Sequence, residues 1–214
     1  MLSGLEKPTI NGARRPLLVG FFFSANVTGM NVTRGYSVVD KEYDMSMILK
    51  AAKFARDAHK GQFRKYGHSD RPYITHVIRV AGRVATLPGA TEAMVAGAYM
   101  HDVVEDTNTT LSDVREFLGE EVADIVDGLT NISKGSTAPR AERKRMDREH
   151  LAAMPVSVRR IKLVDRIDNL GEIRDDHETP EKFTKLYKAE TVLLLESLRG
   201  TDPVLEAELE RLAR

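Results

Sequence analysis

The sequence predicts a single all-α domain of roughly eight helices. Apolar residues recur at spacings of three and four along most of the chain, the period of an amphipathic helix, whereas alternating strand patterns are scarce. The chain of 214 residues is long enough for one domain with a sizeable core, and it contains neither internal repeats nor long linkers. These patterns place the domain at residues 45–200, followed by a short C-terminal helix within 201–214.

Turn and capping residues set the expected limits of the helices. A stretch rich in Gly, Ser, Asp and Pro at 61–72 separates the first two helices, and Pro72 can begin the second because no N–H is needed there. Thr91 is the expected N-cap of the third helix, and Gly119 ends the fourth. The predicted helices cover about 45–58, 72–86, 91–107, 110–118, 122–129, 141–153, 156–170 and 180–199.

Residues 1–44 precede this pattern and are expected to form a weakly ordered extension. Basic residues stand before a short apolar run that ends at Phe23, which is faintly like a signal peptide, but no small-x-small cleavage site follows immediately. The run is also too short to cross a membrane, so we expect a cytoplasmic protein without membrane contact. Met30 and Met45 are alternative starts.

The composition excludes several kinds of site. Without cysteine there is no disulfide, thiolate zinc site or cysteine nucleophile, and a metal would need His, Asp and Glu ligands, which suit Mn²⁺ or Mg²⁺. The net charge is zero, so no global field draws the protein to nucleic acid or membrane. Basic stretches at 56–71 and 140–148 flank an acidic region at 105–127, which suits a cation and a polyanion, although solvated helix faces explain most charge runs.

The most informative motif is Tyr99-Met100-His101-Asp102-Val103-Val104-Glu105-Asp106-Thr107. His101 and Asp102 are good metal ligands, and in a continuous helix Glu105 lies over His101 and Asp106 over Asp102. The flanking apolar residues are typical of an interior, where so many charges are costly unless a cation or hydrogen bonds compensate. An ordinary acidic helix surface is the simpler alternative for this motif alone.

Two further clusters place ionisable residues on or near predicted helices. Asp165 and Asn169 share a helical face beside an apolar stripe, so a metal could partner a buried aspartate. For this segment alone, an ordinary amphipathic helix with surface Asp–Arg pairs is the favoured interpretation. His76 stands on the second helix, where a lone histidine is more often a hydrogen-bonded core residue. Arg64 and Lys65 precede it in a loop, where such residues are more often solvated.

The order of these groups is more specific than any one of them. A His, a His-Asp pair and an Asp on three helices of a cysteine-free α-domain resemble the ligand order of HD-domain metal-dependent phosphohydrolases. Five motifs between about residues 47 and 200 resemble, more narrowly, the hydrolase domain of RelA/SpoT-type alarmone enzymes: Gln62-Phe63-Arg64-Lys65, Pro72-Tyr73-Ile74-Thr75-His76, the motif 101–107, Asp127-Gly128-Leu129-Thr130 and Lys162-Leu163-Val164-Asp165-Arg166-Ile167-Asp168-Asn169-Leu170.

Other segments narrow the resemblance to a subgroup. Glu142-Arg143-Lys144-Arg145 and Thr179-Pro180-Glu181 are similar to the metazoan members of this group. No synthetase or regulatory domain has room to follow in 214 residues, so the chain resembles a free-standing small alarmone hydrolase.

The resemblance implies an activity and a role for each matching residue. One Mn²⁺ per chain would be bound by His76, His101, Asp102 and Asp165. The attacking water would be positioned or deprotonated by Glu105 and Asp106. The substrate would be contacted by Arg64, Lys65, Asn169 and Tyr187. The implied reaction is manganese-dependent cleavage of guanosine 3′,5′-bis(diphosphate), or the pentaphosphate form, to GDP or GTP and pyrophosphate, which ends an alarmone signal.

The chain departs from the family's pattern near the expected substrate. Tyr66 stands where the family often has a small residue, and the loop to Pro72 is longer than in the bacterial bifunctional enzymes. Asp168 replaces the His or Tyr that is common before the Asn. We therefore expect an altered base pocket and an altered charge beside the substrate.

Three alternative functions use the same fold. The first is an antitoxin-type hydrolase that removes pyrophosphate from the 3′ end of modified tRNA and has a tRNA or toxin partner. The second is a phosphatase acting on NADPH, and the third is a non-catalytic, degenerate HD module that senses nucleotide. The basic stretch 140–148 fits an RNA contact and a phosphate contact equally. The intact ligand and acidic residues favour catalysis over sensing, and the sequence leaves the oligomeric state open.

Overall fold

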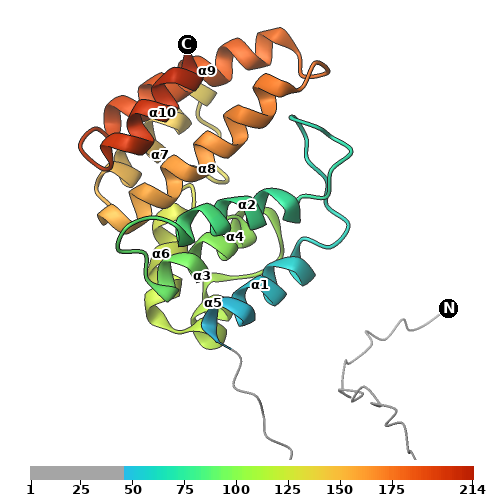
Figure 1. The fold of residues 1–214 in the computed structure, drawn as a ribbon, viewed down its shortest axis with the longest axis vertical. Helices are drawn as coiled ribbons and strands as arrows, with labels where there is room; N and C mark the ends of the chain where they lie inside the picture. The colour runs from blue at the N-terminus through green and yellow to red at the C-terminus, as the bar shows by residue number, and fades with distance from the viewer. Residues whose placement is uncertain (1–45) are drawn as a thin grey trace, which may run out of the picture. The chain divides into compact units, whose positions relative to one another are not determined.

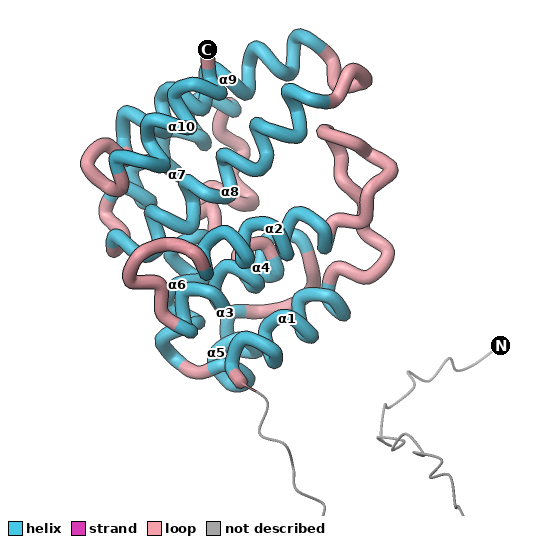
Figure 2. The backbone as a smooth tube through the Cα atoms, in the orientation of Figure 1, coloured by secondary structure: helices cyan, strands magenta, loops and turns pink. Residues whose placement is uncertain are grey.

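The computed structural model describes residues 46–214, so the expectations for residues 1–44 lie outside it. The described residues contain ten α-helices, and their only β-pairing is one isolated antiparallel bridge between Phe63 and Pro72 (Figures 1 and 2). The all-α prediction is confirmed. Within the same residues, no helix combines the length and the apolar character needed to span a membrane.

The helices follow one another with short connections, and two of them organise the rest. In chain order they are α1 (Met47–Ala58), α2 (Ile74–Ala85), α3 (Glu92–Met100), α4 (Val103–Asp106), α5 (Leu111–Leu118), α6 (Glu120–Leu129), α7 (Arg140–Ala152), α8 (Val156–Asp175), α9 (Glu181–Ser197) and α10 (Pro203–Ala213).

The first organising element is α3, which lies in the centre of the fold. It packs against α1, α2, α6 and α8. Seven of its nine residues are buried, including Met100, because its sequence is apolar on every side. A helix of this kind is stable only when neighbours cover its whole circumference. The side chains at its C-terminal end therefore enter the interior.

The second organising element is α8, which packs against α2, α6, α9 and α10 (Figure 1). The sequence predicted its end near Leu170, but the helix continues to Asp175. It continues because Glu172 and Ile173 are buried on the face that already carries Asp165. The predicted C-terminal helix is α10, whose Leu205 and Leu209 are buried.

The predicted helix over 91–107 is wrong in one respect: it is divided at His101 and Asp102. The first part, α3, ends at Met100, and α4 begins at Val103. The ring nitrogen Nδ1 of His101 donates to the carbonyl of Ala98 at 2.7 Å, the acceptor that the Asp102 N–H would use in a continued helix. Asp102, the N-cap of α4, then adopts φ −106° and ψ −2°, which departs from the ideal values of a continuous α-helix. The Asp106 N–H still donates to the Asp102 carbonyl at 2.8 Å, so Asp106 lies one helical turn beyond Asp102 as expected, although the helix is interrupted before it.

Close packing between α3 and α6 generates a stability prediction. A Cβ added at Gly97 would overlap the Cγ2 methyl of Ile125, whereas a Cβ at Gly82 on α2 meets nothing within 4 Å. Overpacking should make Gly97→Ala less stable by about 1–3 kcal/mol. Gly82→Ala should gain up to about 1 kcal/mol of helix propensity. Urea denaturation of the two variants checks this, and equal effects would contradict the close contact.

Candidate functional site

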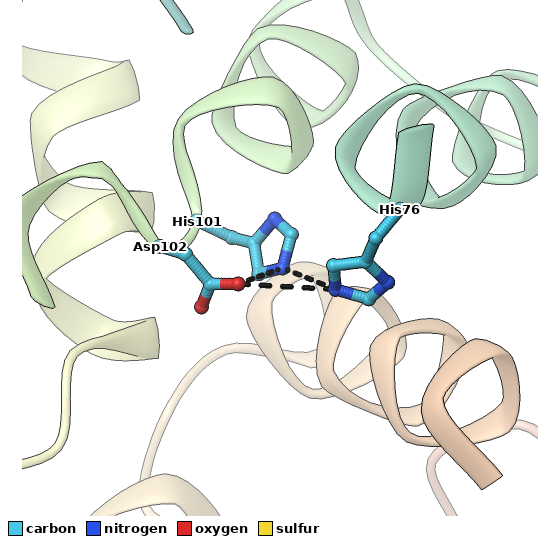
Figure 3. A group of neighbouring side chains, drawn as sticks. All are labelled: His76, His101 and Asp102. Atoms are coloured by element: carbon cyan, nitrogen blue, oxygen red, sulfur yellow. Dashed lines mark hydrogen bonds and ion pairs between the residues drawn. The ribbon is translucent and has the colours of Figure 1, made fainter. Parts of the chain in front are cut away.

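Three side chains converge where α2 meets the junction of α3 and α4. The Nε2 atoms of His76 and His101 lie 3.2 Å apart, and Asp102 Oδ2 lies 2.9 Å from His101 Nε2 and 3.8 Å from His76 Nε2 (Figure 3). Both histidines are buried. The three ligand atoms lie within 4.8 Å of one another, which is the arrangement of a metal-binding group.

A fourth carboxylate reaches the same point from α8. Asp165 Oδ1 lies 3.3 Å from His76 Nε2 and 3.8 Å from His101 Nε2. The structure thus brings together all four residues that the sequence predicted as ligands. Lys162 Nζ, one turn earlier on α8, forms an ion pair with the other oxygen of Asp165 at 2.9 Å.

The outer nitrogens of both imidazoles are already occupied. Nδ1 of His76 lies 2.6 Å from Asp168 Oδ2, and Nδ1 of His101 donates to Ala98 O. These acceptors favour the proton on Nδ1 and leave Nε2 with its lone pair toward the centre. Two lone pairs 3.2 Å apart, beside two carboxylates, repel each other unless a cation lies between them. The residues present therefore fit a divalent metal ion held by nitrogen and oxygen atoms.

The electrostatics of the group also favour a positive charge. Burial lowers the pKa of His101, but the negative charges of Asp102 and Asp165 outweigh it and raise that pKa to about 9. Burial likewise raises the pKa of Asp102, but the charge and hydrogen bond of His101 hold it below its usual range. A proton on His101 thus supplies the positive charge that a metal ion would bring.

The sequence did not predict the support behind His76. Asp168 accepts two hydrogen bonds from Arg79, at 2.7 Å from Nε and 2.9 Å from Nη2, so its carboxylate is fixed while it contacts His76 Nδ1. Arg79 also forms an ion pair with Glu172 at 2.6 Å. The signal was present: Arg79 follows His76 by three residues, and Asp168 and Glu172 are four apart on α8.

The same contacts continue to the loop before α2. Glu172 forms an ion pair with Arg64 Nε at 2.9 Å, and Arg64 Nη2 donates to Asn169 Oδ1 at 2.5 Å. Asn169 in turn donates through Nδ2 to Asp165 Oδ1 at 2.5 Å. Arg64 is 7% exposed, which corrects the expectation that loop cations here are usually solvated. Side-chain contacts therefore join Arg64 to the metal-binding group by two routes. One runs through Asn169 to Asp165, and the other runs through Glu172, Arg79 and Asp168 to His76.

The acidic residues after the His-Asp pair line a separate cavity. Glu105 accepts hydrogen bonds from the backbone N–H of Asn131 at 2.6 Å and from its side-chain Nδ2 at 2.8 Å. Burial raises the pKa of Glu105. Asp106 is exposed, and the two acids share a cavity of about 220 Å³. The sequence missed Asn131, although it directly follows the Asp127–Thr130 motif.

The remaining predicted substrate residues differ in their placement. Lys65 is exposed, with its ammonium 5.7 Å from the centre of the Tyr66 ring. Tyr66 stacks on Phe183 of α9 with ring centroids 3.9 Å apart, which joins the loop to α9. The ring of Tyr187, one turn further along α9, lies under Arg166 at 4.4 Å.

Comparison with known proteins agrees with this geometry. The family model of the HD domain matches residues 51–199, which include the whole metal-binding group. The chain belongs to the HD-domain family. Within this family it is MESH1-like, because it is 34% identical over 174 residues to guanosine-3′,5′-bis(diphosphate) 3′-pyrophosphohydrolase MESH1 of Xenopus tropicalis, with 79% of this chain and 94% of the relative covered.

Two further relatives support the same assignment. Human MESH1 is 33% identical, again over 79% of this chain and 94% of its own length. The solved structure of a metazoan orthologue of SpoT that hydrolyses ppGpp superposes with a TM-score of 0.70 at 28% identity, covering 79% of this HD-domain chain and 95% of that one. The resemblance to the RelA/SpoT-related group is confirmed.

The clamp on His76 generates a prediction for metal binding. Asp168→Asn keeps the shape of the side chain but weakens the acceptor for His76 Nδ1, so Mn²⁺ affinity should fall roughly 10- to 100-fold. Isothermal titration with Mn²⁺ measures this. Asp175→Asn is the matched control on the same helix, because Asp175 is exposed and pairs with Arg174. Equal affinities for both variants would contradict a role for Asp168.

Proposed function

We propose that this HD-domain chain is a manganese-dependent 3′-pyrophosphohydrolase. It would convert guanosine 3′,5′-bis(diphosphate), or the pentaphosphate form, to GDP or GTP and pyrophosphate and so end an alarmone signal. The observation that carries the proposal is the convergence of His76, His101 and Asp102. The chain is also similar, over most of its length, to relatives that are named for this activity.

The proposed ligands of the ion are His76, His101, Asp102 and Asp165. Two imidazole nitrogens and two carboxylates without a thiolate suit Mn²⁺. A bound Mn²⁺ supplies a water of lowered pKa and offsets negative charge on phosphoryl oxygens. Tyr73 donates from its hydroxyl to Asp102 Oδ2 at 2.5 Å, which orients that carboxylate toward the histidines.

Glu105 is the proposed proton acceptor for the attacking water. Asn131 fixes both of its oxygens, and its raised pKa makes it a stronger base than an exposed glutamate. Asp106 is exposed at the same cavity and is proposed to position the water. In the hydrolysis, the water oxygen forms a bond to the phosphorus that is attached to the 3′ oxygen. The bond between that phosphorus and the 3′ oxygen breaks. Glu105 takes one proton, the 3′ oxygen gains one, and pyrophosphate is released.

The proposed nucleotide contacts lie on the loop between α1 and α2, on α8 and on α9. Arg64 is held by Glu172 and Asn169, so its guanidinium is oriented before any substrate arrives. The exposed ammonium of Lys65 is free to meet a phosphate group. Tyr187 and Asn169 complete the proposed set.

A substrate panel tests the proposed function. The full chain is stripped of metal, reloaded with Mn²⁺ and supplied with ppGpp, 3′-pyrophosphorylated tRNA or NADPH. We expect pyrophosphate release from ppGpp, and no detectable turnover by Asp102→Asn, because that change removes a charged ligand. Phosphate and pyrophosphate release are measured.

The other outcomes select the alternatives. Turnover of tRNA alone would indicate the antitoxin-type hydrolase, and turnover of NADPH alone would indicate the phosphatase. Tight nucleotide binding without turnover of any substrate would indicate a sensor. Full activity of Asp102→Asn would contradict the ligand assignment.

The acid limb of the pH profile tests Glu105. Because burial raises the pKa of this carboxyl, the wild-type rate should fall as the pH drops through a value above that of an ordinary glutamate. Glu105→Gln should lose about 10²- to 10⁴-fold in kcat and lack this limb, while keeping its metal. Glu121→Gln, an exposed change on α6, serves as control. An unchanged acid limb in Glu105→Gln would rule Glu105 out as the base.

A further inference from the structure

The cavity that begins at Glu105 and Asp106 has a basic opposite wall. Its volume of about 220 Å³ far exceeds the roughly 10–15 Å³ that one water requires. The wall is built by the loop before α7 and by the first two turns of that helix. The lining residues beyond the two acids are Asn131, Ser133, Lys134, Arg140, Arg143, Lys144 and Asp147.

Two of the cations in this wall already serve the fold. Lys134 donates to the carbonyls of Val104 and Glu105, at 3.1 and 3.0 Å, and so caps α4. Arg140 forms two hydrogen bonds to Glu190 of α9, at 2.7 and 2.9 Å. Lys134 is thus held by two backbone carbonyls, and Arg140 by a carboxylate.

The other two cations lack such partners. Among residues 46–214, the side chain of Arg143 forms no hydrogen bond or ion pair, and its Nε atom is buried. Lys144 Nζ lies 3.9 Å from Asp147, whose carboxylate already accepts from the N–H and hydroxyl of Ser133 at 3.0 and 2.9 Å. Arg143 and Lys144 are neighbours on α7, so one anion in the cavity can meet both.

The surroundings of Lys144 disfavour its positive charge, which a bound anion would stabilise. Burial lowers its pKa, and the positive charges of Lys162 and Arg166 lower it further. Other residues of the basic stretch 140–148 do have close carboxylate partners. Arg145 faces solvent and pairs with Glu142 and Glu149 at 2.6 and 2.5 Å.

We propose that Arg143 and Lys144 bind the terminal phosphate of the 3′-pyrophosphate, and that this cavity makes the site select a pyrophosphate ester over a 3′-monophosphate. The inference rests on the proposed function, because it places the scissile phosphorus between the metal-binding group and Glu105. Glu105 and Asp106 line this cavity together with Arg143 and Lys144, so the outer phosphate of an ester whose scissile phosphorus faces Glu105 extends toward the two cations. A monophosphate leaves the Arg143 side chain without a partner and Lys144 with only its 3.9 Å contact to Asp147.

Two kinetic ratios test this inference on the full, Mn²⁺-loaded chain. For Arg143→Ala and Lys144→Gln, kcat/KM should fall roughly 10- to 100-fold with ppGpp, the loss expected for a hydrogen bond to a charged group. With guanosine 5′-diphosphate 3′-monophosphate the values should stay within about twofold. Arg145→Ala is the matched control and should match the wild type with both substrates. Equal losses on both substrates would overturn the proposal.

Direct binding separates this inference from the proposed activity. Inorganic pyrophosphate and orthophosphate are titrated into the wild type and the same variants, whose melting temperatures establish that they are folded. We expect the variants to lose roughly 10- to 100-fold in pyrophosphate affinity and to keep their orthophosphate affinity. If no variant binds pyrophosphate more weakly, the subsite is wrong even where ppGpp is hydrolysed. If ppGpp is not hydrolysed but pyrophosphate binding depends on Arg143, the subsite stands and the proposed substrate does not.

Discussion

Two imidazoles and two carboxylates are held in the interior with their free atoms pointing at one another, and this constraint shapes the rest of the domain. Burying such groups is costly unless each finds a partner. The Nδ1 atoms of His101 and His76 therefore donate hydrogen bonds to Ala98 and Asp168, respectively. Asp165 forms an ion pair with Lys162 and accepts a hydrogen bond from Asn169. The requirement also explains why α3 stops at Met100, since a continued helix would need the carbonyl that His101 uses.

Sequence patterns predicted what depends on nearby residues. Helical periodicity located most helices. The order of His76, His101-Asp102 and Asp165 located the metal-binding group, although in the structure these residues lie on α2, at the junction of α3 and α4, and on α8. The break at His101 was not predictable from periodicity, since a side-chain bond to a backbone carbonyl competes with the helix there. Arg79 and Asn131 were missed because their partners lie far along the chain and meet them only in the folded state.

Two residues that depart from the pattern expected of the family make specific contacts in this chain. Asp168 forms an ion pair with Arg79 and accepts a hydrogen bond from the ring of His76. Tyr66, in place of a small residue, stacks on Phe183 and joins the loop carrying Arg64 to α9. Gly67 follows with φ 71°, packed so closely that a Cβ there would lie 2.7 Å from Glu172 Cβ. The loop between α1 and α2 is thus held by the stacking of Tyr66 on Phe183 and by the close packing of Gly67 against Glu172.

The contacts around α8 form a closed circuit. From His76 they run through Asp168, Arg79, Glu172, Arg64 and Asn169 to Asp165, which faces His76 again. Under the proposed function, this circuit would link the binding of the ion to the binding of the nucleotide. Linkage is reciprocal: whatever factor the ion adds to the affinity for a ligand touching Arg64, that ligand adds to the affinity for the ion. A shortage of the metal would then lower both the rate of hydrolysis and the affinity for the nucleotide.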